Sequence, residues 1–270
     1  MTRLLLSTLL IFTISTYVSA NEYLEALKGV CEIEVNVSPC DTPIRTGPLG
    51  TGTAFLVADK SEDSNWVDGE YKFVYIFITA EHVVEDLTPK TRLVTMPNGD
   101  KEKITSDPHF DLKIFHRTDK GRIYAVREFS ASKCESEYVK YTLTSYPALD
   151  MAILIVKSKS AIGKISPMQI ATKEEVDNVT IGDRIIGAGC SNNTPMVREG
   201  KIGEIHARFF QSNSQVAPGD SGGPLIKDGK VIGVMTNRMS VGTFSQNINA
   251  LRKRIKDPEL KEAIFGEKSN

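Results

Sequence analysis

The sequence has almost no excess charge of either sign. Its 33 lysines and arginines oppose 34 aspartates and glutamates, for a formal net charge of −1. Binding to nucleic acid or to an anionic membrane surface usually needs a basic excess, so neither is predicted here. Hydrophobic residues make up 40% of the 270 residues, which is enough for a packed core and argues against disorder. The length allows one large domain or two small ones.

Long hydrophobic runs are also scarce, and the main one lies at the start of the chain. Arg3 precedes an apolar stretch that ends at Val18, and Val18 and Ala20 occupy the two positions that a signal peptidase reads. A membrane anchor is the alternative, but the apolar stretch is short and no basic stop-transfer cluster follows it. We therefore expect residues 1–20 to be a signal peptide cleaved after Ala20. The mature protein would be secreted or periplasmic and not held in a membrane.

Cysteine occurs four times, as Cys31, Cys40, Cys134 and Cys190. An even number in an exported chain suggests two disulfides, and four cysteines allow three pairings. We favour Cys31–Cys40 with Cys134–Cys190, and buried free thiols remain the alternative. No C-x-x-C or H-E-x-x-H motif occurs, and the four histidines form no cluster, so neither a metal site nor a cofactor is predicted.

Most apolar segments are short, rich in β-branched or aromatic residues, and bounded by turn residues. This pattern predicts an all-β chain. The main expected strands cover residues 50–57, 73–79, 92–96, 112–116, 122–126, 151–156, 184–189, 201–210 and 230–236.

Two further features organise the chain. The polar stretch Lys157–Ser166 has no strand pattern and predicts a boundary, so we expect one half over residues 21–157 and another over residues 158–270. Apolar residues with helical spacing near the end predict a helix over residues 246–256.

The most informative stretch is Gly219–Leu225, which reads G-D-S-G-G-P-L. Glycines around Ser221 permit a tight, partly left-handed turn that exposes the serine hydroxyl. The same turn can direct the N–H groups of Gly219 and Ser221 to one point, where they would stabilise an oxyanion formed in acyl transfer. A glycine-rich hairpin with an incidental serine is the alternative, but the length of the matching string favours a nucleophile.

A serine nucleophile needs a base that takes its proton and a carboxylate that orients the base. His82 follows a strongly apolar strand, in the string T-A-E-H-V-V, and is the candidate base. Asp150 precedes another apolar strand, in the string D-M-A-I-L, and Asp111 is a second candidate carboxylate because it also opens a strand. A structural histidine is the alternative reading of His82.

These three motifs, in the order His, Asp, Ser, resemble those of the chymotrypsin/trypsin-like serine peptidase superfamily. Gly50–Val57 resembles the G-[ST]-G strand of bacterial trypsin-like and HtrA-like members. The resemblance implies a fold of two six-stranded Greek-key β-barrels, with the site in the crevice between them. Asp111 lies too soon after His82 for the first barrel to be complete, so Asp150 is favoured.

The resemblance implies a catalytic triad of His82, Asp150 and Ser221, with the oxyanion hole at the N–H groups of Gly219 and Ser221. It also implies a substrate-binding pocket, which would be lined by Gln215, Val216 and Thr236. No acid lies among these three residues, so we expect a preference for small or medium uncharged side chains rather than for Lys or Arg.

Two departures from the superfamily pattern also carry predictions. The I-V-G-G-type terminus that pairs with the residue matching Asp220 in animal digestive members is not found. We therefore expect Asp220 to have another partner, for which an arginine is suited. The sequence after the serine motif is too short for the PDZ domain of many bacterial members, so we expect none.

The expected activity is that of a serine endopeptidase that hydrolyses peptide bonds in protein or peptide substrates through an acyl-enzyme. The alternatives are a peptidase-like binding protein that has lost turnover and an esterase with the same triad. The oligomeric state is not predicted.

Overall fold

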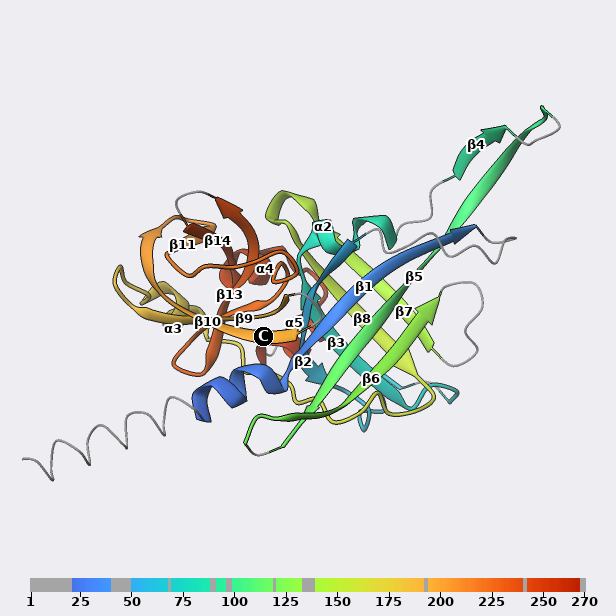
Figure 1. The fold of residues 1–270 in the computed structure, drawn as a ribbon. Coiled ribbons are helices and arrows are strands. Elements are labelled where there is room, and N and C mark those ends of the chain that lie inside the picture. Colours follow the sequence, from blue (N-terminus) through green and yellow to red (C-terminus); the bar gives the residue numbers. More distant parts are fainter. Residues whose placement is uncertain are drawn as a thin grey trace, which may run out of the picture.

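The strands of the described residues form two β-sheets, as the short β-prone segments predict (Figure 1). The structure is a computed structural model that describes residues 21–39, 50–67, 69–87, 91–95, 99–118, 120–132, 139–191, 194–239 and 242–267. The expected signal peptide, residues 1–20, lies outside the described residues. None of the helices within those ranges is long and apolar enough to cross a membrane.

The first sheet has eight strands, and seven of them follow the order β4-β5-β1-β2-β3-β8-β7, while β6 pairs with β5. All of its pairings are antiparallel. The strands are β1 (Val30–Pro39), β2 (Gly50–Asp59), β3 (Phe73–Thr79), β4 (Thr91–Thr95), β5 (Lys101–Arg117), β6 (Ile123–Ser132), β7 (Val139–Tyr146) and β8 (Met151–Ser158).

Strands β3 and β8 are neighbouring interior strands of this sheet, between β2 and the edge strand β7, and both are strongly apolar. In β3, Ile76 and Ile78 belong to one hydrophobic cluster, whereas Tyr75 and Phe77 belong to another. Successive side chains of a strand point to opposite faces, so the two clusters lie on the two sides of the sheet. This double burial explains why β3 is an almost continuous apolar run.

The second sheet is a closed barrel of six strands in the order β10-β11-β14-β13-β12-β9. Its strands are β9 (Arg184–Ser191), β10 (Thr194–Ile205), β11 (Phe209–Ser212), β12 (Pro224–Lys227), β13 (Lys230–Met239) and β14 (Gly242–Asn247). A short helix, α3 (Lys173–Asp177), precedes the barrel.

Two helices follow the barrel, where the sequence predicts one. The expected helix corresponds to α4 (Ile248–Arg254), whereas α5 (Pro258–Phe265) was not expected. Asp257 caps α5 through hydrogen bonds to two backbone N–H groups, and Gly266 ends it with a positive φ of 68°. These are standard signals for the start and end of a helix.

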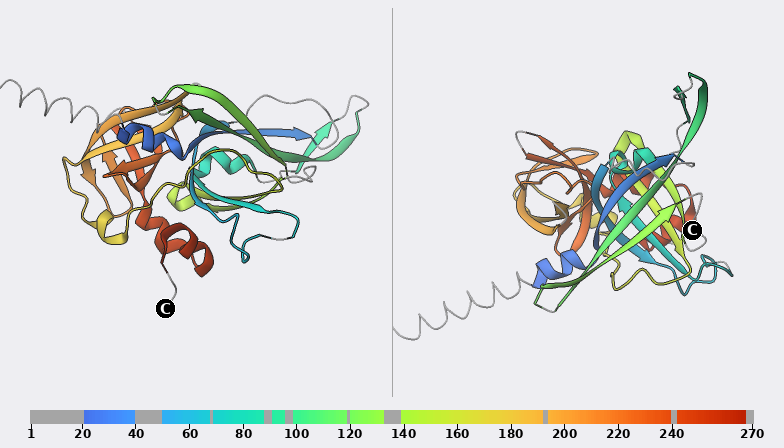
Figure 2. Two further views of the ribbon diagram at one scale, coloured as in Figure 1. Left: turned by 90° about the horizontal axis from the view of Figure 1, so that it is seen from below. Right: turned by 45° about the vertical axis from the view of Figure 1, so that its right-hand side comes forward.

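The expectation of two closed barrels is confirmed only for the second half. Among the described residues, β6 pairs with β5 and β7 pairs with β8, and no pairing between β6 and β7 closes the first sheet. Residues 133–138, which connect β6 to β7, are outside the described ranges. Strand β5 is 17 residues long, and its first part pairs with β4 in a ribbon that extends away from the sheet (Figures 1 and 2).

Candidate active site

His82 lies on the one-turn helix α2 (Glu81–Val84), directly after the buried strand β3. Val83 and Val84 are buried, which anchors the turn in the core and leaves the His82 side chain 43% exposed. The apolar residues of T-A-E-H-V-V therefore hold the imidazole at the surface of the first half.

Asp150 follows a 3₁₀ turn, η2 (Pro147–Leu149), and has a left-handed backbone with φ 48° and ψ 47°. Aspartate tolerates this conformation better than most residues. Both carboxylate oxygens of Asp150 lie 2.9 Å from His82 Nδ1, and the backbone N–H of His82 donates to Oδ1 at 3.0 Å. These contacts fix the imidazole with a proton on Nδ1, which leaves Nε2 free to accept one.

The hydrogen bond that His82 donates to Asp150 raises the pKa of His82 above its ordinary value of 6.5, and partial burial opposes this effect. The same carboxylate adds a coulombic contribution in the same direction. Asp150 therefore stabilises the imidazolium that would form when His82 accepts a proton.

The rival carboxylate, Asp111, has other partners. It lies in β5, where its Oδ2 accepts a hydrogen bond from Asn36 Nδ2 at 3.0 Å and its Oδ1 accepts one from Ser130. These contacts join three adjacent strands of the first sheet. The structure therefore brings Asp150 rather than Asp111 to His82.

Ser221 lies in the turn between β11 and β12. Gly219 and Gly222 on either side of it have φ of 95° and 88°, as the glycine pattern predicts. The Ser221 hydroxyl lies 3.5 Å from the carbonyl oxygen of Thr236. Within the described ranges, the N–H groups of Gly219 and Ser221 donate no backbone hydrogen bond, so both remain free to bind an oxyanion.

The serine turn packs directly against the end of the strand that leads to His82. A Cβ at Gly222 would lie 2.3 Å from Thr79 Oγ1 and 2.8 Å from the backbone nitrogen of Ala80. Only glycine allows this close approach. The serine motif and the histidine motif, which come from different halves of the chain, are therefore in contact.

Asp220, next to the serine, is 1% exposed and pairs with Arg198 of β10. Arg198 Nε donates to Asp220 Oδ2 at 2.6 Å, and the backbone N–H of Ala217 donates to the same oxygen at 2.7 Å. This confirms the expectation that an arginine replaces the terminal ammonium partner. The pair ties the serine turn to the barrel wall.

Comparison with known proteins now adds to this geometry. A family model for the trypsin-like peptidase domain matches residues 52–234, which include His82, Asp150 and Ser221. The chain belongs to this family. Among solved structures, the crystal structure of Deg5 matches with a TM-score of 0.54 and 17% sequence identity, over 87% of this chain and 90% of that chain. At this identity the match supports the fold alone, and the search of curated proteins finds no match.

The three residues expected to line the substrate pocket of this trypsin-like peptidase differ in burial. Val216 and Thr236 are both 6% exposed, whereas Gln215 is exposed. Of these three residues, Thr236 contacts the serine, through its carbonyl oxygen. The lining of the pocket therefore remains a prediction.

Sequence reasoning missed a cluster of buried hydroxyls close to these residues. The hydroxyls of Ser212 and Ser214 are 2.8 Å apart, and Thr243 Oγ1 donates to the carbonyl oxygen of Ser214 at 2.5 Å. A string of polar residues just before the nucleophile, S-N-S-Q, was the only signal in the sequence.

The favoured disulfide pairing is wrong, because each expected pair includes a cysteine that is free in the structure. Cys31 of β1 and Cys190 of β9 are buried free thiols. The Cys31 thiol donates to the carbonyl oxygen of Ala54 at 3.4 Å. Burial raises the pKa of both thiols, which makes them unreactive core residues. Cys40 and Cys134 are outside the described ranges.

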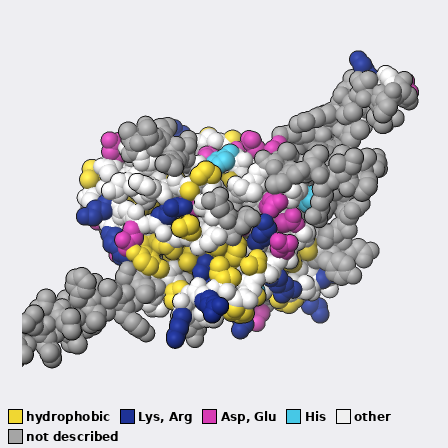
Figure 3. Space-filling model, in the orientation of Figure 1, with side chains coloured by type: hydrophobic (Ala, Val, Ile, Leu, Met, Phe, Trp, Pro, Cys, Tyr) yellow, Lys and Arg dark blue, Asp and Glu magenta, His cyan; other side chains and the backbone are white. Residues whose placement is uncertain are grey.

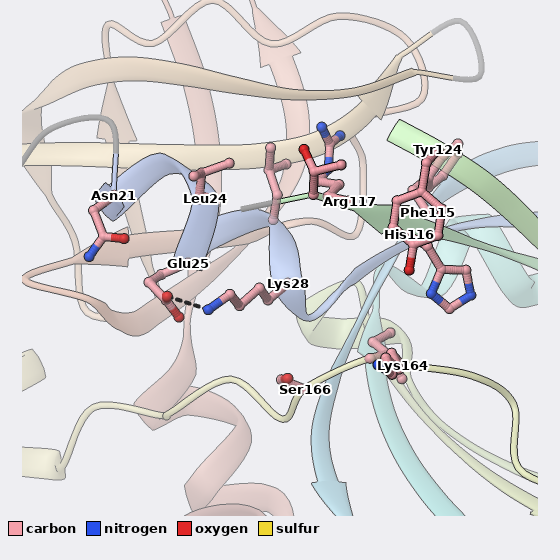
Figure 4. A pocket seen from close by; sticks show the side chains of 13 residues that line it. Asn21, Leu24, Glu25, Lys28, Phe115, His116, Arg117, Tyr124, Lys164 and Ser166 are labelled. Atoms are coloured by element: carbon pink, nitrogen blue, oxygen red, sulfur yellow. Dashed lines mark hydrogen bonds and ion pairs between the residues drawn. The ribbon is translucent and has the colours of Figure 1, made fainter. Parts of the chain in front are cut away.

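A cavity of about 490 Å³ lies elsewhere, between the helical residues 21–28, the adjoining ends of β5 and β6, and residues 164–166 (Figure 4). Lys28, Arg117 and Lys164 are among its lining residues, and no member of the expected triad is. This hollow is therefore separate from the candidate active site.

Two further observations concern charge. On the face shown in Figure 3, basic and acidic side chains both occur, with apolar side chains between them, in agreement with the small net charge. Within the described residues, no group of three or more His, Cys, Asp or Glu side chains could hold a metal ion.

Proposed function

We propose that this trypsin-like peptidase is a serine endopeptidase in which His82, Asp150 and Ser221 form the catalytic triad. The observation that carries the proposal is the two-oxygen contact of Asp150 with His82 Nδ1, on a turn that packs against the serine turn. A carboxylate placed in this way sets the imidazole tautomer that a serine nucleophile requires.

In the proposed mechanism, His82 Nε2 accepts the hydroxyl proton of Ser221 while Oγ attacks the scissile carbonyl carbon. His82 then gives this proton to the leaving amine, and the acyl group stays on Ser221. Water repeats the sequence on the acyl-enzyme and releases the second product. Asp150 stays ionised throughout and stabilises the imidazolium.

The oxyanion would be held by the N–H groups of Gly219 and Ser221. Neither donates to a backbone acceptor among the residues that the structure describes, which supports this role. In another serine peptidase, removal of one oxyanion-hole donor lowers kcat by about 10²–10³-fold. The proposed site needs neither a cofactor nor a metal, because every proton transfer is assigned to His82.

We propose the chymotrypsin-like arrangement for the whole domain, with the first half over residues 21–157, the second over residues 158–270, and the site between them. The closed barrel and the family match support this arrangement. Residues 1–20 would act as a signal peptide, so that the enzyme works outside the cytoplasm on protein or peptide substrates.

For specificity, we propose a small or medium uncharged side chain on the acyl side of the cut bond. Gln215, Val216 and Thr236 would line the pocket, and none of them carries a charge that would hold Lys or Arg. Digestion of a peptide library reads the preference directly, and strong cleavage after Arg would contradict it.

Turnover of a denatured protein substrate, followed by mass spectrometry of the products, tests the function itself. The wild-type protein should cleave it, Ser221→Ala should not, and Ser160→Ala, which alters an exposed serine outside the site, should cleave at the wild-type rate. Equal inactivity of all three would favour the alternative, a peptidase-like binding protein.

A further inference from the structure

One buried residue of the first half holds both carbonyl groups that flank Asp220 in the second half. Thr53 of β2 is fully buried. Its hydroxyl donates to the carbonyl oxygen of Gly219 at 2.7 Å, and its backbone N–H donates to the carbonyl oxygen of Ser221 at 2.7 Å. The hydroxyl oxygen also accepts a hydrogen bond from the backbone N–H of Cys190 at 2.8 Å. The hydroxyl therefore donates to the serine turn and accepts from β9, the strand behind it.

A second buried threonine continues these contacts toward the histidine. Thr79, the last residue of β3, donates from its hydroxyl to the carbonyl oxygen of Thr53 at 2.8 Å. Thr79 is fully buried and lies three positions before His82. The hydrogen bonds thus run from β3, the strand that precedes the histidine, through Thr53, to both sides of the nucleophile.

The serine turn needs an external support of this kind because its own residues restrict it little. Glycines at 219 and 222 can adopt many backbone conformations. Each peptide group is planar and moves as a unit. Fixing the carbonyls of Gly219 and Ser221 therefore fixes the peptide plane before Asp220 and the peptide plane after Ser221. The plane between them, which carries the N–H of Ser221, then has little freedom to rotate.

We propose that Thr53 is a positioning residue that sets the oxyanion hole and couples it to the docking of the two halves. The inference rests on the proposed function, since it concerns the geometry of that same site. Thr53 does not touch the substrate. It acts by holding the Ser221 N–H group in the direction that an oxyanion requires.

The matched variants Thr53→Val and Thr53→Ser separate the effect of the hydroxyl's hydrogen bonds from the effect of side-chain shape. Valine keeps the branched shape without the hydrogen bonds, and serine keeps the hydroxyl. We expect Thr53→Val to lower kcat by about 10- to 100-fold, since misplacement by about 1 Å at a reacting centre costs about 10²-fold. KM should change little, and Thr53→Ser should retain most of the activity.

A second measurement is the affinity for a peptide boronic acid, which mimics the tetrahedral intermediate. A purely structural role of Thr53 would leave this affinity unchanged. It should fall in Thr53→Val by the same factor as kcat/KM, because both depend on the oxyanion hole. As a control, Ser158→Ala removes a buried hydroxyl that bonds to the carbonyl oxygen of Ser160, outside the site. That variant should keep wild-type kcat and boronate affinity.

The outcomes separate this inference from the proposed function. A wild-type protein without turnover contradicts the function. Amide hydrogen exchange then still tests the support, which predicts faster exchange in Thr53→Val at Cys190, whose backbone N–H donates to the Thr53 hydroxyl. A turnover-competent wild type with unchanged kcat and boronate affinity in folded Thr53→Val overturns the inference. If Thr53→Val does not fold, Thr79→Val tests the same contacts, and unchanged kcat there overturns it.

Discussion

At the residue scale, the hydrogen bond between His82 and Asp150 predicts that the proposed activity depends on pH. Asp150 raises the pKa of His82 above 6.5, and the proposed mechanism needs the neutral imidazole. The value of kcat/KM should therefore rise with pH through a midpoint above 6.5. The same shift stabilises the folded state below the unfolded pKa of His82, and this contribution is lost as the pH rises through the folded pKa.

Asp150→Asn tests this cause directly. The variant should move the midpoint of the kcat/KM profile to lower pH, because the group that favours the imidazolium is lost. It should also lower kcat by about 10⁴-fold, as loss of the orienting carboxylate does in another serine peptidase. An NMR titration of His82 provides the independent measurement, and a midpoint that moves upward would contradict the assignment.

The buried pair of Arg198 and Asp220 gives a prediction for stability. Arg198→Met leaves the Asp220 carboxylate buried without its charged partner, which should lower the free energy of unfolding by about 3–5 kcal/mol. Urea unfolding measures the loss. Asp220→Asn in the same chain should restore part of it, because the unpaired charge is then gone. Equal stability of wild type and Arg198→Met would show that the pair does not hold the turn.

The roles of residues within a recognisable motif could be predicted from the sequence. The roles of residues that depend on which strands lie side by side could not. Each member of the proposed triad lies within a short string of characteristic neighbours. Arg198 lies in no such string, and the string around Thr53 indicates a strand but not the contacts of its threonine. The roles of both residues depend on which strand of a sheet lies beside the serine turn. The need for an arginine beside Asp220 was predictable from the missing terminus, but its position was not.

At the level of elements, strand prediction succeeded where burial dictates the pattern. β3 and β8 are nearly all apolar because they are covered on both faces. Strand β5 begins at Lys101, although the sequence predicts a strand only over residues 112–116. The prediction is too short because the first part of the strand, K-E-K-I-T-S-D-P, lacks a strand pattern. Its pairing with β4 and β1, which no local pattern encodes, extends it.

Helix α5 shows a local signal that was present but not used. Asp257 accepts hydrogen bonds from the N–H groups of Glu259 and Leu260, and Leu260 is buried beneath the cap. Asp257→Ala should lower the free energy of unfolding by about 1 kcal/mol. Thermal unfolding measures this, and kcat/KM should stay unchanged because α5 contributes no residue to the proposed site. A loss of activity without a loss of stability would contradict this purely structural role.

For the whole molecule, the structure implies that packing rather than a disulfide at Cys31 or Cys190 holds the two halves together. Both residues are free and buried, in strands of different sheets. Neither should react with iodoacetamide in the native protein, and both should react without reductant once the chain is unfolded. Peptide mapping after alkylation locates the labels. Protection that persists in the unfolded, non-reduced chain would show a disulfide instead.

The central claim is that Ser221 is a nucleophile activated by His82 across the contact between the two halves. The most direct test is labelling with a fluorophosphonate, with the modified residue located by mass spectrometry. The account predicts one adduct on Ser221 in the wild type, none in Ser221→Ala, and strongly slowed labelling in His82→Ala. Labelling at another serine, or equal rates in wild type and His82→Ala, would contradict it.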